Sequence, residues 1–367
     1  MTPAPPSTII LHDVFVVRGG GERLVLTLAA GLADALCYGY RAAESFDPAE
    51  FFSGRIVDLD ARGSAFGVRT FKLYHAFRHR TSFVANYENA VYSGILSPLA
   101  VFNHARGRNV YYCHTPPRFA YDKYRETLAT FAAWKRPLMR CYVPLLRWLY
   151  AGAMARMDTI VANSEHVRGR VQQYLGRDAI VVNPPCDTAG FVWRGQGDYY
   201  LSTARLDALK RVDVIVAAFK QMPDKRLVVA SGGVELAKLK ALAAGAANIE
   251  FTGWTGEEAM RDLVGRAIAT VYIPQHEDFG MSPVESMAAG KPVLGVAEGG
   301  LVETVQDGRT GVLLAPNPRP EHLVAAVREL TPAKALEMRL ACEARASEFA
   351  AALFLDKMRA VLSAAPR

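Results

Sequence analysis

The chain has 367 residues, of which 51% are hydrophobic and 22% charged, and its formal net charge is +7. This length suits two domains with separate cores, and the composition is that of a globular protein. No apolar run reaches the ~18 residues that a membrane-spanning helix needs. The N-terminus lacks a basic segment followed by an apolar one, so we expect no signal peptide and a cytoplasmic location.

The cysteines indicate the redox compartment of the protein, and the charges indicate its kind of partner. The five cysteines include no Cys-x-x-Cys pair, which argues against structural zinc and favours a reducing compartment. Residues 1–185 hold 22 Lys and Arg against 14 Asp and Glu, whereas the remainder is nearly neutral. A basic half predicts an anionic partner, either nucleic acid or a membrane surface. Nucleic acid is disfavoured because no common nucleic-acid-binding motif is present.

The first elements indicate an α/β unit. Residues 8–17 predict a buried strand, a glycine turn follows at residues 19–21, and a helical pattern extends over residues 23–38. Strand, glycine turn and helix open a dinucleotide-type unit, although neither Gly-x-Gly-x-x-Gly nor a Walker lysine is present. The turn is therefore either a plain tight turn or an approach of the backbone to a phosphate. Residues 55–59 predict the next strand, and its Asp58-x-Asp60 pair is not expected to hold a metal.

Further strands are expected at residues 90–94 and 109–113. The second ends in Cys113-His114-Thr115-Pro116, and an aromatic residue and an aspartate follow closely. A histidine at the carboxyl end of a strand lies where α/β sheets bind ligands, although a lone histidine there is more often structural.

Residues 134–157 interleave basic and aromatic side chains on a predicted helix. Such a helix could lie on anionic lipid or could simply cover the sheet. Pro137 and Pro144 are expected to break it. Strands at residues 159–162 and 180–183 then lead into Pro184-Pro185, a predicted interdomain linker.

The second half begins again with a strand, at residues 199–203, followed by Arg205 and Lys210. Two cations at the mouth of a strand can converge on one pyrophosphate. Later strands at residues 226–230 and 249–252 end in glycine turns, and Trp254 is expected to pack rather than to stack on a base. A hairpin-like turn and strand are expected at residues 308–314.

The most informative segment spans residues 274–290, where a strand end, a loop and a helix start follow one another. Ser282 is the expected N-cap, Pro283 the first helical residue, and Glu285 a member of the first turn. Free N–H groups at such a helix start form an anion site, and Gly280 lets the backbone approach a ligand. Glu277 and Glu285 flank this site, which suggests that they bind neutral hydroxyls of a sugar and a ribose.

Glu277-x7-Glu285 with Phe279-Gly280 inside resembles the donor site of retaining family 4 glycosyltransferases of the GT-B fold. The segment at His114 resembles mannosyltransferases that build bacterial O-antigen and exopolysaccharide. This resemblance implies an α/β protein with two Rossmann-like β/α/β domains facing across a deep cleft. It implies an acceptor-binding domain at residues 1–185, a donor domain at 186–346, and a helix within 347–367 that crosses back to the first domain.

The resemblance also implies residue roles. His114 and Glu277 would contact the sugar, and Arg205 and Lys210 would stabilise the departing diphosphate, so these four are the expected catalytic residues. Glu285 would bind the ribose. The implied donor-binding residues are Gly19, Gly20, Gly232, Gly253, Trp254, Phe279, Gly280, Met281, Ser282 and Glu285. Arg118, Tyr121 and Asp122 would lie on the acceptor side.

The expected reaction is transfer of mannose from GDP-mannose, with retention, to a glycan or lipid-linked saccharide in the assembly of bacterial surface polysaccharide or lipopolysaccharide. No metal or other cofactor is expected. Two alternatives remain open: a UDP-sugar-dependent transferase, such as a glucosyltransferase, and a catalytically degenerate protein that binds sugar nucleotides. Peripheral contact with the inner face of the cytoplasmic membrane, through the basic half, also remains open.

Overall fold

The computed structural model describes residues 7–63 and 66–364. The chain divides into two compact units, which are described separately. Unit 1 comprises Met1–Asn183 and Phe354–Arg367, and unit 2 comprises Pro184–Leu353. Within the described ranges, no helix is both long and apolar enough to cross a membrane.

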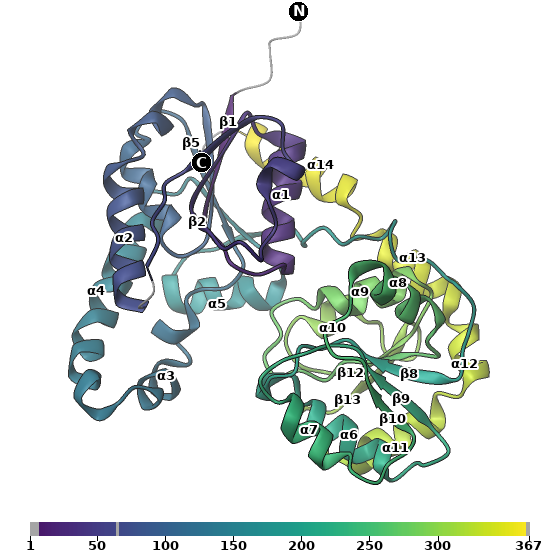
Figure 1. The fold of residues 1–367 in the computed structure, drawn as a ribbon. Coiled ribbons are helices and arrows are strands. Elements are labelled where there is room, and N and C mark those ends of the chain that lie inside the picture. Colours follow the sequence, from purple (N-terminus) through teal and green to yellow (C-terminus); the bar gives the residue numbers. More distant parts are fainter. Residues whose placement is uncertain (1–6, 64–65, 365–367) are drawn as a thin grey trace, which may run out of the picture. The chain divides into compact units, whose positions relative to one another are not determined.

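Unit 1 is built on a parallel seven-stranded sheet with the order β3-β2-β1-β4-β5-β6-β7 (Figure 1). The strands are β1 Thr8–Phe15, β2 Ala35–Arg41, β3 Arg55–Asp58, β4 Asn89–Ser93, β5 Arg108–Cys113, β6 Thr159–Ala162 and β7 Ile180–Val181. The helices are α1 Gly20–Leu32, α2 Phe66–His79, α3 Tyr124–Thr130, α4 Arg136–Met154, α5 Glu165–Leu175 and α14 Ala351–Ser363. Short 3-10 helices are η1 Pro48–Glu50, η2 Ser82–Asn86, η3 Ser97–Asn103, η4 Arg118–Ala120 and η5 Ala133–Lys135.

Helices cover both faces of this sheet, because alternate strand residues point to opposite sides. Ile9 and Leu11 of β1 belong to the core that includes α2, α4 and α5. Ile10, between them, belongs to the core that includes α1, and Phe354 and Met358 of α14 pack into that same core.

The helix expected over residues 23–38 is wrong in its second half. Helix α1 ends at Leu32, and β2 begins at Ala35. Residues of β2 alternate between the two cores, with Cys37 on one side and Leu36 and Tyr38 on the other. A short apolar run fits either a strand or a buried helix, so periodicity alone could not separate them.

The breaks expected at Pro137 and Pro144 are also wrong. Pro137 is the second residue of helix α4, and the helix continues through Pro144. Pro144 removes the hydrogen bond to the carbonyl of Arg140, but both residues are exposed, so water can hydrate that carbonyl.

Unit 2 repeats the same strand order in a parallel six-stranded sheet, β10-β9-β8-β11-β12-β13. The strands are β8 Tyr199–Ser202, β9 Arg226–Val229, β10 Ile249–Phe251, β11 Thr270–Val271, β12 Val293–Val296 and β13 Gly311–Leu314. The helices are η6 Ala208–Lys210, α6 Val212–Lys220, α7 Leu236–Leu242, α8 Glu257–Arg266, α9 Met281–Ala288, α10 Leu301–Thr304, α11 Pro320–Glu329, α12 Pro332–Glu337 and α13 Arg339–Ser347. The prediction of two Rossmann-like units is confirmed. The strand expected within residues 308–314 is β13, but it pairs in parallel with β12, so the turn before it does not form a hairpin.

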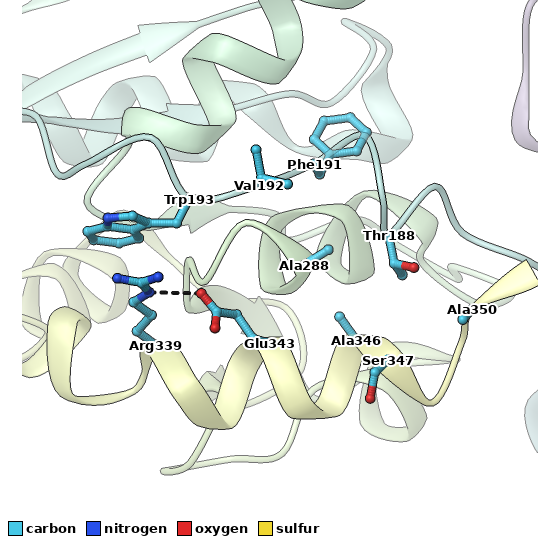
Figure 2. Close-up of a pocket in the computed structure, with 10 residues that line it drawn as sticks. All are labelled: Thr188, Phe191, Val192, Trp193, Ala288, Arg339, Glu343, Ala346, Ser347 and Ala350. Atoms are coloured by element: carbon cyan, nitrogen blue, oxygen red, sulfur yellow. Dashed lines mark hydrogen bonds and ion pairs between the residues drawn. The ribbon is translucent and has the colours of Figure 1, made fainter.

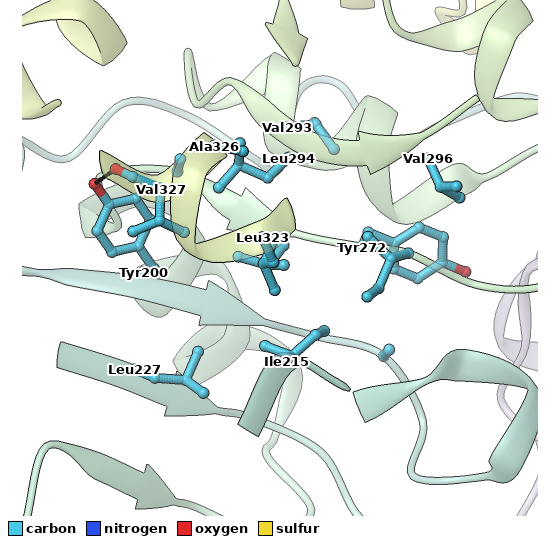
Figure 3. Packing of buried hydrophobic residues seen from close by; sticks show 14 of the residues in the cluster. Tyr200, Ile215, Leu227, Tyr272, Val293, Leu294, Val296, Leu323, Ala326 and Val327 are labelled. Atoms are coloured by element: carbon cyan, nitrogen blue, oxygen red, sulfur yellow. Dashed lines mark hydrogen bonds between the residues drawn. The ribbon is translucent and has the colours of Figure 1, made fainter. Parts of the chain in front are cut away.

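The core of unit 2 anchors the strands that carry its site. Figure 3 shows strand residues such as Tyr200 and Val293 packed against Leu323 and Val327 of α11. The Tyr200 hydroxyl, which is buried, donates to the carbonyl oxygen of Leu330 at 2.8 Å. This bond satisfies a polar atom that would otherwise be costly to bury.

Gly39 explains how closely α2 approaches β2. A Cβ at Gly39 would lie 2.2 Å from Leu73 Cδ2 and 2.7 Å from the carbonyl oxygen of Asp13. We predict that Gly39→Ala destabilises the protein by about 1–3 kcal/mol through overpacking. Gly169→Ala is the matched control: nothing lies within 4 Å of its added Cβ, and it should stabilise α5. Thermal unfolding midpoints test this, and equal midpoints for the two variants would contradict it.

Candidate functional site

Both units place their chemistry-bearing side chains where the strand order reverses. The reversal lies between β1 and β4 in unit 1 and between β8 and β11 in unit 2. In open parallel sheets, ligands bind beyond the carboxyl ends of the strands at this point, because the neighbouring connections diverge to opposite faces.

In unit 2, Lys210, Glu277 and Tyr272 form a compact triad at this point. Lys210 Nζ lies 2.7 Å from Glu277 Oε2 and donates to the Tyr272 hydroxyl at 3.0 Å. The Tyr272 hydroxyl donates to the same Glu277 oxygen at 2.9 Å. Burial and the nearby Glu277 hold the pKa of Tyr272 well above its ordinary value, so its phenol is a donor at neutral pH. The triad thus presents a cation and a carboxylate side by side.

Arg205 does not join this triad. Its side chain is largely exposed and pairs with Asp207 at 2.9 Å. Asp207 also caps η6 by accepting from the backbone N–H of Leu209. The structure therefore brings together Lys210 and Glu277 but leaves Arg205 at the rim of the same loop.

Arg211 holds the loops around the triad, and sequence reasoning gave it no role. Its guanidinium is buried and donates at 2.7 Å to each of the carbonyl oxygens of Ile273 and Pro274. It also pairs with Glu298 after β12 at 3.0 Å. A buried arginine with several acceptors satisfies its charge and fixes the three loops to one another. Tyr272 likewise had no predicted role.

The start of α9 differs from the prediction in three respects. The N-cap is Gly280, at φ 91°, so Ser282 is the second helical residue and not the cap, and Pro283 is the third and not the first. Glu285 lies beyond the first turn. Phe279 is buried just before this start, and Met281 is the first helical residue. A left-handed N-cap favours glycine, which a sequence search for Ser, Thr, Asp or Asn does not detect.

Glu285 nevertheless lies close to the triad. Its charge contributes to the raised pKa values of the Tyr272 phenol and the Cys186 thiol, after burial as the main cause of both. Two carboxylates, Glu277 and Glu285, therefore share this neighbourhood of unit 2.

The two glycine turns behave differently. Gly232 contacts Trp254, since a Cβ at Gly232 would lie 2.4 Å from the indole Nε1. Gly253, at φ 73°, has open space around it. Trp254 packs only against the turn at Gly232, because its side chain is 74% exposed.

In unit 1, His114 follows β5 and joins a chain of hydrogen bonds. Its Nε2 lies 2.8 Å from Ser93 Oγ, and Ser93 Oγ lies 3.2 Å from His12 Nδ1. Asn163 donates to the backbone oxygen of His114 at 2.9 Å. Asp13 accepts from three backbone N–H groups after β4 and so fixes the loop that follows Ser93. Sequence reasoning missed His12 and Ser93, because their proximity depends on the pairing of β1 with β4.

Burial keeps both histidines neutral. It lowers the pKa of His12 to about 4 and that of His114 to about 3, and proximity to His12 lowers the latter further. A neutral His114 can donate or accept one hydrogen bond but is no cation near neutral pH.

The first turn of α1 approaches His114. A Cβ at Gly21 would lie 3.7 Å from His114 Cε1. Gly19 is the N-cap of α1 and Gly20 its first residue. Burial raises the pKa of the Glu22 carboxyl, and the backbone groups of Val17 and Gly19 partly oppose this. The glutamate thus faces the same turn that was predicted to bind phosphate.

Arg118, Tyr121 and Asp122 form a separate cluster around η4. Asp122 accepts from Arg118 at 3.1 Å and from Arg170 at 2.8 Å. Burial alone would raise the pKa of Asp122, but these two guanidinium groups outweigh it and lower the pKa. Tyr121 stacks on Tyr174, and Arg147 lies over its ring. These ion pairs and ring contacts fit a structural role as well as a binding one.

A pocket of about 460 Å³ in unit 2 contains none of the predicted site residues. Figure 2 shows its lining, with Trp193 beside Arg339 and the Arg339–Glu343 pair. Lys291 lies 3.4 Å from the centroid of the Trp193 ring, and burial lowers the pKa of its amine to about 7. The pocket lies between the segment before β8 and helix α13. The described residues hold no cluster of three or more His, Cys, Asp or Glu side chains that could bind a metal.

Comparison with known proteins gives the fold its name. Over 97% of the chain, the structure matches HepE of Anabaena in complex with UDP and glucose, with a TM-score of 0.76, 17% identity and 99% coverage of that chain. The fold is GT-B. Residues 189–348, which form most of unit 2, match the family model of glycosyl transferases group 1.

Two relatives carry the name alpha-1,3/1,6-mannosyltransferase ALG2. The Mus musculus protein is 23% identical over 96% of this chain and 95% of its own length. The Dictyostelium discoideum protein is 47% identical over 60 residues, 16% of this chain, and that match spans only 14% of the relative's length.

The buried histidines predict a pH-dependent stability. Unfolded histidines gain protons below about pH 6.5, whereas the folded pair does so only at lower pH. Stability should therefore be flat above pH 6.5 and fall below it, by up to ~1.4 kcal/mol per pH unit for each histidine. His12→Asn should shallow this fall, whereas the exposed His75→Asn should not. Urea unfolding at about pH 7 and about pH 5 tests this. An unchanged pH dependence in His12→Asn would contradict it.

Proposed function

We propose that this protein is a glycosyltransferase that transfers a hexose from a nucleotide sugar, with retention at the anomeric carbon. The observation that carries the proposal is the Lys210–Tyr272–Glu277 triad at the strand-order reversal of unit 2. The match of this unit to glycosyl transferases group 1 supports it.

The triad suits the chemical demands of that reaction. A departing nucleoside diphosphate develops negative charge, which Lys210, Arg205 and the N-terminus of α9 would stabilise. Glu277 would accept hydrogen bonds from hydroxyl groups of the sugar, and Glu285 would accept them from both hydroxyls of the ribose. When the donor binds, Lys210 gives up part of its contact with Glu277 and contacts the diphosphate. Before that, the ion pair with Glu277 compensates the half-buried charge of Lys210.

We assign the donor to unit 2 and the acceptor to unit 1, with His114 as a neutral ligand of sugar hydroxyls. The acceptor itself supplies the nucleophilic hydroxyl, and the leaving phosphate accepts its proton. No residue of the triad is required as a covalent nucleophile.

We further propose GDP-mannose as the donor and a glycan or lipid-linked saccharide of the cell surface as the acceptor. The full-length alignment with a protein named as a mannosyltransferase supports mannose. A UDP-sugar is the second candidate, since the HepE structure contains UDP and glucose. The basic surface of unit 1 would hold the protein at the inner face of the membrane.

The carboxylate assignment predicts a loss of activity in Glu285→Ala. Donor turnover should fall about 10²–10³-fold, a loss typical of removing one well-placed polar contact from an active site. Glu337→Ala, an exposed glutamate on α12, is the control and should keep full activity. Release of GDP or UDP from GDP-mannose and UDP-glucose is measured in parallel. Full activity in Glu285→Ala would refute its role, and turnover of UDP-glucose alone would refute the mannose donor.

The stereochemical assignment has its own test. Proton NMR of the glycoside formed early in the reaction should show the α configuration of the donor. A β product would contradict retention. Nucleotide binding without any turnover would instead identify the catalytically degenerate alternative.

A further inference from the structure

The lining of an apolar groove on unit 1 includes none of the predicted site residues. The volume of the groove is about 670 Å³, and its walls come from α2, η5 and α4. Figure 1 shows α2 and α4 along the same side of the unit 1 sheet. Both helices pack against η3. The floor of the groove is formed by the buried side chains of Leu96, which immediately precedes η3, and Leu146 of α4.

The rim of this groove exposes large apolar side chains. Phe71 is 68% exposed, Trp134 77%, Leu138 69% and Trp148 71%. Single exposed hydrophobic residues are common, but several around one groove mark a surface that a partner covers. The covering partner must be apolar where it enters the groove.

The helices that form the groove carry charges of one sign, and Lys135 is the charged residue in its lining. Helices α2, η5 and α4 contain no Asp or Glu. Their cationic residues are Arg69, Lys72, Arg78, Lys135, Arg136, Arg140 and Arg147. Lys135 Nζ lies 4.9 Å from the centroid of the Trp134 ring, so one cation borders the apolar rim directly. An apolar groove with a cationic border is complementary to an amphiphile with an anionic head.

We propose that this groove binds the hydrocarbon chain of a phosphate-linked lipid acceptor and that the bordering cations bind its phosphate. This rests on the proposed function, in which a lipid-linked saccharide receives the sugar. A second copy of the chain fits less well, because two faces with this charge repel each other. A flat bilayer surface fits less well, because it leaves the floor of a concave groove uncovered.

The test uses farnesyl phosphate as a soluble probe, below the concentration at which it forms micelles. Calorimetric titration should show saturable binding to the wild-type protein, with weaker binding of farnesol and none of inorganic phosphate alone. Leu138→Asp places a carboxylate at the rim and should weaken farnesyl phosphate binding at least about tenfold, since that charge would be buried against the chain. Leu340→Asp, on a similarly exposed leucine of unit 2, should leave the affinity unchanged.

Equal affinity of Leu138→Asp and the wild type for the probe would overturn the proposal. The proposal would also be overturned if Leu138→Asp lost binding to phosphatidylcholine–phosphatidylglycerol vesicles but kept its affinity for the probe. That result would show that the groove contacts a membrane surface. A wild-type dimer that Leu138→Asp converts to a monomer in sedimentation would assign the groove to a second copy.

Donor hydrolysis without acceptor separates this inference from the proposed function. Normal hydrolysis with no groove-dependent probe binding overturns the groove alone. Groove-dependent probe binding with no turnover of any sugar nucleotide supports the lipid site and refutes the transferase.

Discussion

Lys210 and Glu277 are 67 positions apart in the chain, yet their charged atoms lie 2.7 Å apart. This contact exists because β8 and β11 are neighbours in the sheet of unit 2, with the strand order reversing between them. The loops that follow these two strands therefore emerge side by side. The remainder of the proposed donor site depends on this adjacency.

Buried polar contacts keep these loops in place. The guanidinium of Arg211 donates hydrogen bonds to carbonyl oxygens after β11 and to Glu298 after β12. Gly300 donates to the backbone oxygen of Glu277 at 2.8 Å, so the glutamate is fixed through its main chain as well. Fixed loops keep Lys210 and Glu277 in place before a substrate arrives, which is the preorganisation that electrostatic catalysis needs. Unit 1 repeats the principle with uncharged groups, since Ser93 bridges His12 and His114.

Much of the fold could be predicted from sequence, because long apolar strands and glycine turns carry local signals. The strand at β1, the loop after β8 and the helix at α9 were all expected near their observed places. Residues 35–41 could not be assigned correctly, because a strand buried on both faces shows no alternation. The cap of α9 was misplaced because a left-handed glycine fills it. Tyr272, Arg211, His12 and Ser93 were missed because their roles arise from contacts between distant strands.

In the proposed donor site, Lys210 of the triad binds the diphosphate of the sugar nucleotide. Calorimetric titration of GDP into the wild-type protein and Lys210→Gln tests it most directly, with Lys220→Gln as the control on α6. Lys210→Gln should bind GDP at least about tenfold more weakly, whereas the control should bind it normally, since Lys210 and not Lys220 is proposed to contact the diphosphate. Equal affinity of both variants and the wild type for GDP would show that Lys210 does not bind the diphosphate.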